Sequence, residues 1–154
     1  NGAMGFILNK PLIDVSLEQI WTNIGYKKKN LYLTNEDVFI GGPLASNAMF
    51  VIHSSEYFIE KKTVRVSEKI SVTGTKEITN DIQKGQGPQR ALFLLGHSGW
   101  APGQLEDEIF QNSWMSLSVD SGFVFDEEVS NKWIEAYKIL GVDPIKLSIF
   151  SGRA

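Results

Sequence analysis

The segment from Ala91 to Trp114 constrains the fold most, because three kinds of local pattern follow one another within it. Residues 91–95 are a continuous apolar run, which predicts a buried strand. Residues 96–103 contain three glycines and a proline and predict a tight loop, and the acidic amphipathic stretch beyond them predicts a helix. Such a loop presents backbone N–H groups at the end of a sheet, so we expect any binding pocket to lie here.

The rest of the chain does not alternate strands and helices regularly. Short apolar runs predict strands over residues 5–9, 38–41, 48–53, 115–119 and 123–125. Helical spacing of apolar residues predicts helices over residues 16–24, 75–84 and, from a cap at Asp126 or Ser130, up to Gly141. Several consecutive strands lack a helical crossover, which indicates an α+β fold with a mixed, largely antiparallel sheet.

One segment follows the alternating pattern of a half-exposed hairpin. Between residues 63 and 73, the apolar side chains of Val64, Val66, Ile70 and Val72 alternate with polar ones. We expect this hairpin to turn its apolar side chains to the interior.

The size and composition of the chain limit the classes of function open to it. A chain of 154 residues fits one domain, and we expect residues 1–154 to form it. There is no cysteine, which excludes disulfides, thiolate metal sites and a thiol nucleophile. A net charge of −3 argues against a broad basic surface for nucleic acid or an anionic membrane. No apolar run approaches the roughly 18 residues that could span a bilayer, and we expect a cytoplasmic protein.

A serine nucleophile is the first chemical hypothesis. Ser98 lies between a predicted strand and a predicted helix, where hydrolases place such a serine. The Gly-x-Ser-x-Gly pattern is incomplete, however, because Trp100 takes the place of its final glycine. The only histidines available as a base are the adjacent His97 and the distant His53. A small hydrolase or transferase using Ser98 is therefore an alternative to a binding role.

Other kinds of site have weaker support. Glycines before the helix could bind an anion, but Glu106, Asp107 and Glu108 already place negative charge in its first turn. These acids are more simply explained as a solvated helix face than as acid–base catalysts. No spacing typical of metal ligands occurs, so we expect neither a metal nor a cofactor. The three lysines over 27–29 are a small basic patch, and direct DNA binding by a transcriptional regulator stays a third alternative that we do not expect.

Three blocks of the sequence resemble the signature of the bacterial YqgE/AlgH family. They are Gly2–Leu12, Gly41–Pro43 and the segment Leu95–Ile109 with Asn112–Trp114, and they occur in the family's order. The resemblance implies a bent, bifurcated sheet curled into a partial barrel with helices around it. It also implies about thirty further residues before Asn1. The family has no established biochemical activity, and its regulatory label implies at most an indirect effect on transcription.

Taken together, these patterns predict a non-enzymatic binding module for an unidentified small molecule or protein partner. We expect no catalytic residue, and we expect the site around the glycine-rich segment, with neighbours from two other blocks. The tryptophans Trp21, Trp114 and Trp133 are expected in the core. For Trp100, a place in the core and a binding role, as a pocket wall or an interface anchor, are equally expected. The candidate ligand-binding residues are Gly96, His97, Ser98, Gly99, Trp100, Gly103, Gln104, Asn9, Gly41 and Gly42.

Overall fold

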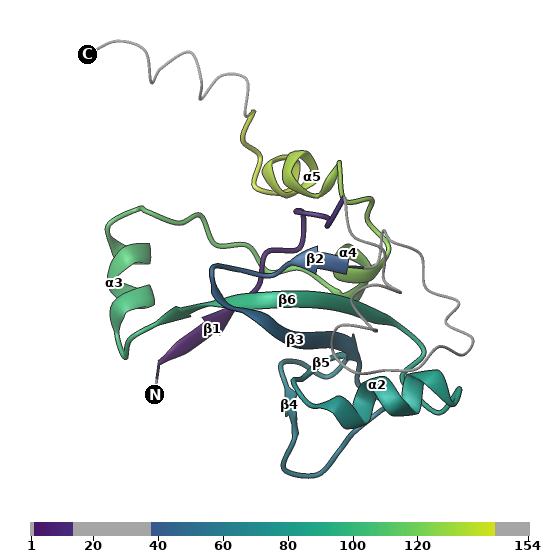
Figure 1. Ribbon diagram of the computed structural model, residues 1–154. Coiled ribbons are helices and arrows are strands. Elements are labelled where there is room, and N and C mark those ends of the chain that lie inside the picture. Colours follow the sequence, from purple (N-terminus) through teal and green to yellow (C-terminus); the bar gives the residue numbers. More distant parts are fainter. Residues whose placement is uncertain (1, 14–37, 144–154) are drawn as a thin grey trace.

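A computed structural model describes residues 2–13 and 38–143, in which six strands form a mixed sheet with helices around it (Figure 1). The strands are β1 (Ala3–Gly5), β2 (Val38–Ile40), β3 (Leu44–Ser54), β4 (Thr63–Arg65), β5 (Ile70–Thr73) and β6 (Ala91–Trp100). The helices are α2 (Lys76–Gln83), α3 (Gln104–Phe110), α4 (Ser121–Phe125) and α5 (Lys132–Ile139). The predicted helix over 16–24, the lysines 27–29 and Trp21 lie outside the described residues.

Strand β6 organises the sheet. One edge of β6 pairs with β3, which continues to β5 and β4 through antiparallel pairs. The other edge of β6 pairs first with β2, in parallel, and then with β1, antiparallel. The sheet therefore divides along β6, and the prediction of an α+β fold with a bent, mixed sheet is confirmed.

The two faces of the sheet carry separate apolar clusters, because successive residues of a strand point to opposite faces. Phe93 of β6 packs with Val38, Val51 and Ile78, the last of which comes from α2. Its neighbour Leu94 packs on the other face with a second cluster, formed by Phe39, Ile52 and Val124 of α4. Both Phe93 and Leu94 are completely buried. The continuous apolar run that predicted this strand thus reflects burial on two faces.

The β4–β5 hairpin follows the prediction only in β5, where Ile70 and Val72 pack against the cluster of buried residues around Leu94. In β4 the orientation is reversed. Val64 is 65% exposed, whereas Ser71 and Thr73 are completely buried. The buried hydroxyls are hydrogen-bonded: Thr73 Oγ1 lies 2.9 Å from His53 Nε2 and 2.7 Å from Thr63 Oγ1. Because each polar group has a partner, burying the polar face leaves no unpaired polar group in this network.

The predicted strands over 115–119 and 123–125 are wrong. Residues 121–125 form helix α4 instead, and residues 115–120 have no regular structure. Asp120 explains the helix, since its side chain accepts a hydrogen bond of 2.9 Å from the backbone N–H of Phe123, as an N-cap residue does. Helix α5 is confirmed, but it begins after Asn131 and not after Asp126 or Ser130.

The first strand is also displaced from its predicted range of 5–9. Strand β1 ends at Gly5, and the chain then leaves β6 to run beside β2. There the backbone N–H of Ile7 donates to Gly41 O at 2.8 Å, and that of Leu12 donates to Val38 O at 2.9 Å. These bonds carry the segment containing Asn9 past the β2 edge of the sheet.

Candidate functional site

The segment predicted as a loop over 96–103 is mostly strand. Strand β6 runs on to Trp100, with Ser98 opposite Gly5 and Trp100 opposite Ala3. Only residues 101–103 separate it from α3. Gly96 has a positive φ of 73°, and the pairing of β3 with β6 shifts register between Leu44 and Met49. The segment is therefore an irregular strand that bends as it leaves the core.

Three of the candidate residues, Gly41, Gly42 and Gly96, lie where two backbone segments pack closely against each other. A Cβ added to Gly42 would lie 2.2 Å from the carbonyl carbon of His97, and one added to Gly96 would lie 2.6 Å from Gly42 O. A Cβ on Gly41 would lie 2.4 Å from Gly96 O. The backbone N–H of Gly41 also donates to Leu95 O at 2.7 Å. Close backbone approach between β2 and β6 is sufficient to account for these glycines.

The surroundings of Ser98 do not assemble a catalytic pair. His97 and Ser98 are adjacent in a strand, so their side chains leave opposite faces. The His97 ring instead packs edge-on against Phe50, with 5.3 Å between ring centroids. His53 is completely buried, and its ring nitrogens lie 2.9 Å from Ser54 O and from Thr73 Oγ1. Within the described residues, no hydrogen bond joins Ser98 to either histidine.

A cluster of polar and aromatic side chains lies just beyond the strand. The Glu108 carboxylate accepts hydrogen bonds from Trp100 Nε1 at 3.0 Å, Trp114 Nε1 at 2.7 Å and Gln104 Nε2 at 2.9 Å. These donors, Trp114 foremost, lower the pKa of Glu108. The indoles of Trp100 and Trp114 meet edge to face, with centroids 5.8 Å apart. Gln104 Oε1 accepts from the backbone N–H of Ala101 at 2.9 Å, which ties the cluster to the turn after β6.

Several large apolar side chains in and just after α3 are exposed. Phe110 is 88% exposed and Trp114 is 50% exposed, so the prediction that Trp114 lies in the core is wrong. The same holds for Trp133, which is 51% exposed. Helix α3 lies at the end of β6 farthest from α2 (Figure 1). We call this region the α3 surface; it comprises Trp100, Gln104, Glu108, Ile109, Phe110, Trp114 and Met115.

The hydrogen bonds of Glu108 were missed from the sequence. Glu108 reads as one of three acids on a solvated helix face, and Trp114 reads as a core residue because tryptophan is large and apolar. Asn112 supplies the missing step, because its positive φ of 58° turns the chain after α3 so that Trp114 returns to Glu108. Asparagine tolerates this conformation, so an Asn between a helix and a tryptophan is the one local signal available.

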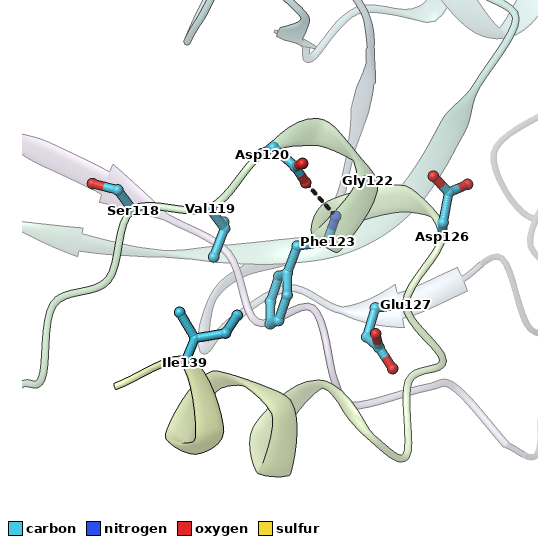
Figure 2. Close-up of a pocket in the computed structure, with 8 residues that line it drawn as sticks. All are labelled: Ser118, Val119, Asp120, Gly122, Phe123, Asp126, Glu127 and Ile139. Atoms are coloured by element: carbon cyan, nitrogen blue, oxygen red, sulfur yellow. Dashed lines mark hydrogen bonds between the residues drawn. The ribbon is translucent and has the colours of Figure 1, made fainter. Parts of the chain in front are cut away.

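A cleft beside α4 contains none of the predicted residues. Figure 2 shows Val119, Phe123 and Ile139 approaching one another at its centre, with Asp120 and Glu127 at its rim. The cleft has a volume of about 470 Å³. The Asp120 carboxylate is engaged as the cap of α4.

A second cleft, of about 600 Å³, lies against Phe39 and Val124 and includes Asn9. Its only basic side chain, Lys132, is buried and donates to the carbonyl oxygens of Phe123, Val124 and Glu127 at 2.9, 3.1 and 2.7 Å. Burial lowers the pKa of Lys132. Because all three donors of the ammonium group are occupied, Lys132 closes the C-terminal end of α4 and leaves no donor for a ligand.

Neither a metal site nor a membrane span can be assembled from the described residues. Across 2–13 and 38–143, no group of three or more His, Asp or Glu side chains could hold a metal ion. Within the same ranges, none of the helices is long and apolar enough to cross a bilayer.

Comparison with known proteins places the chain among proteins of uncharacterised function. The sequence pattern of the AlgH-like family matches residues 1–145. A UPF0301 protein of Ruegeria pomeroyi is 37% identical over 154 residues, which cover 100% of this chain and 83% of the relative. A UPF0301 protein of Cereibacter sphaeroides is 39% identical over 158 residues, with the same two coverages.

Solved structures agree with the fold. The solution structure of the AlgH protein from Pseudomonas aeruginosa is 27% identical, with a TM-score of 0.76 over 99% of this chain and 78% of that chain. Protein DIP2367 from Corynebacterium diphtheriae is 18% identical with a TM-score of 0.61, covers 99% of this chain and 76% of its own, and supports the fold alone.

Proposed function

The chain belongs to the AlgH-like family, and within it we propose that this protein is a non-enzymatic binding module of the cytoplasm with an indirect regulatory role. The α3 surface is its proposed contact site. Of the residues predicted from sequence, Trp100, Gly103 and Gln104 contribute to this surface or to its base. Gly41, Gly42 and Gly96 lie outside this surface, where the chain between β2 and β3 packs closely on β6.

The arrangement around Trp114 carries the proposal. Glu108 receives both indole N–H groups and thereby holds Trp114 in one orientation while half of that side chain stays exposed. Holding a large aromatic side chain in place before binding reduces the conformational entropy lost on binding. Exposed tryptophans next to other apolar side chains are typical of the residues that dominate protein interfaces. Phe110 and Met115, four residues before and one residue after Trp114 in the sequence, are 88% and 54% exposed.

Catalysis by Ser98 has less support than binding. A serine nucleophile requires a base within hydrogen-bond reach and a third group that orients the base. In the described residues, His53 is hydrogen-bonded to Thr73 and His97 packs on Phe50. The prediction for the hydrolase alternative is that Ser98→Ala abolishes turnover of esters or phosphate esters.

Photo-crosslinking in the cell tests the proposal. The photoreactive residue p-benzoylphenylalanine is placed at Phe110 in one variant of the full chain and at Trp133 in another. Trp133 is the control because it is also an exposed aromatic side chain, at 51% against 88% for Phe110, but belongs to α5. We expect irradiation to give a discrete adduct with one protein from position 110 and none from position 133. Equal labelling at both positions, or none at either, contradicts the proposed contact site.

A further inference from the structure

The charge of the chain is distributed unevenly along the sequence. None of the 15 lysines and arginines lies between residues 91 and 131. The same segment contains seven acidic residues: Glu106, Asp107, Glu108, Asp120, Asp126, Glu127 and Glu128. Three of these acidic residues lie on α3, and the other four lie at or just after α4, where Asp120 caps the helix and Asp126 pairs with Arg90. The net charge of −3 for the whole chain conceals this local excess of negative charge.

Of the three acidic residues on α3, two are available to a partner. Glu106 and Asp107 are exposed, and no ion pair within the described residues involves either of them. They lie within one helical turn of Ile109 and Phe110. Helical spacing places Glu106 and Phe110 together on the side of α3 that faces away from Glu108, so a carboxylate and an exposed apolar side chain lie next to each other there.

We infer that the partner at the α3 surface presents a basic amphipathic protein segment, with apolar side chains on one side and lysine or arginine beside them. This inference rests on the proposed function and names the chemistry of its partner. Apolar side chains cover Phe110, Met115 and the exposed part of Trp114, while cations meet Glu106 and Asp107. Charge complementarity of this kind accelerates encounter and selects the orientation of the bound segment.

Tryptophan adds a second reason for a cationic partner. The face of an indole attracts a guanidinium or ammonium group, and the attraction grows when the pair is shielded from water. Trp114 is turned edge to face against Trp100, and half of its surface remains exposed. An arginine of the partner can therefore contact the exposed part of the Trp114 ring.

The charge also separates this partner from other occupants. Nucleic acid and anionic lipid are both repelled by a surface that has carboxylates and no basic side chain. A second copy would have to bring its own basic apolar region, such as Lys61, Lys62 and Val64 on the β4–β5 hairpin.

Peptide binding to the full chain is the test. The probe is an amphipathic helical peptide of about 18 leucine and lysine residues, long enough to form a helix on binding, and its control replaces every lysine by glutamate. Labelling with 5-fluorotryptophan gives each indole its own fluorine resonance. We expect the lysine peptide to shift the resonance of Trp114, and the glutamate peptide to leave it unchanged. Because opposite charges are screened by salt, we expect affinity to fall on the order of tenfold between about 50 and 500 mM salt.

Paired charge reversals locate the effect. Glu106→Lys with Asp107→Lys should weaken lysine-peptide binding by about tenfold or more. Glu60→Lys with Glu68→Lys changes the net charge equally, near the β4–β5 hairpin, and should change binding by less than about twofold. Equal losses in the two double variants would show a response to net charge alone and overturn the inference. Circular dichroism confirms that both variants fold.

The outcomes distinguish this inference from the proposed function. If position 110 gives an adduct but the protein shows no preference for the lysine peptide, the proposed binding module is supported and the inference of a basic partner is overturned. Sedimentation that shows self-association, abolished by Phe110→Ser, assigns the surface to a second copy and also overturns the inference. Absence of both the adduct and peptide binding removes the two proposals together.

Discussion

Replacement of Gly96 by alanine should destabilise the protein more than replacement of a glycine with the same backbone conformation elsewhere. Gly96 has a φ of 73°, which costs a residue with a Cβ roughly 1–2 kcal/mol. The added Cβ would also lie 2.6 Å from Gly42 O and 2.8 Å from Leu44 O, and such overpacking costs about 1–3 kcal/mol. We therefore expect Gly96→Ala to lower the free energy of unfolding by about 2–5 kcal/mol.

Gly85 is the matched control. Its φ is 72°, but nothing lies within 4 Å of an added Cβ, so Gly85→Ala should lose only the conformational part, roughly 1–2 kcal/mol. Urea titration followed by tryptophan fluorescence measures both losses, provided the denaturant dependence of the free energy is unchanged. Equal destabilisation by the two variants would refute the claim that close backbone approach between β2 and β6 explains Gly96. A loss of partner binding without extra destabilisation would instead assign Gly96 to ligand contact.

Four further predictions concern buried or hydrogen-bonded polar groups. Glu108→Gln should shift the fluorescence of Trp114 to longer wavelength. In the parent chain, because the pKa of Glu108 is lowered, the hydrogen-bonded cluster should persist until the pH falls below 4.5, the ordinary pKa of glutamate. An unchanged emission spectrum would contradict this. Burial lowers the pKa of His53 below 6.5, so the stability that its neutral ring provides is complete above pH 6.5 and declines as the pH falls. His53→Gln should flatten that decline, and parallel stability curves for the two proteins would count against it. Lys132→Met leaves three carbonyl oxygens without their shared donor and should lower the free energy of unfolding by roughly 1–3 kcal/mol in the same urea titration. Asp120→Ala removes the cap of α4 and should cost about 1 kcal/mol, whereas Asp120→Asn should be nearly neutral; equal losses would contradict a capping role.

The core strands could be predicted because a strand that is buried on both faces has a continuous run of apolar residues. Residues 38–41, 48–53 and 91–95 are continuous apolar runs, and the strands β2 and β3 that contain most of the first two both pair with β6, which contains the third. The second half of β6 could not be predicted in this way. Glycines at 96 and 99 indicate a loop locally, but pairing with β1, more than ninety residues earlier, makes this segment a strand.

The candidate site was predicted in part for the same reason. Its location at the end of β6 follows from the local pattern, and Trp100 and Gln104 do reach the surface cluster. The contribution of Trp114 depends on a turn at Asn112 and on a hydrogen bond to Glu108. The spacing of apolar residues in the sequence indicates neither of them. The reversed orientation of β4 has a similar cause, because Thr63 is buried where its hydroxyl group is hydrogen-bonded to Thr73, which is also hydrogen-bonded to His53.

The central claim is that the α3 surface is the contact site of a binding module. Fluorine NMR of the 5-fluorotryptophan-labelled full chain, titrated with the purified protein recovered from the Phe110 adduct, tests this claim most directly. Trp114 and Trp133 are 50% and 51% exposed, so each serves as the standard for the other. We predict that the Trp114 resonance shifts in proportion to complex formed while that of Trp133 stays in place. A shift of Trp133 alone, or of neither residue at saturating partner, would contradict the claim.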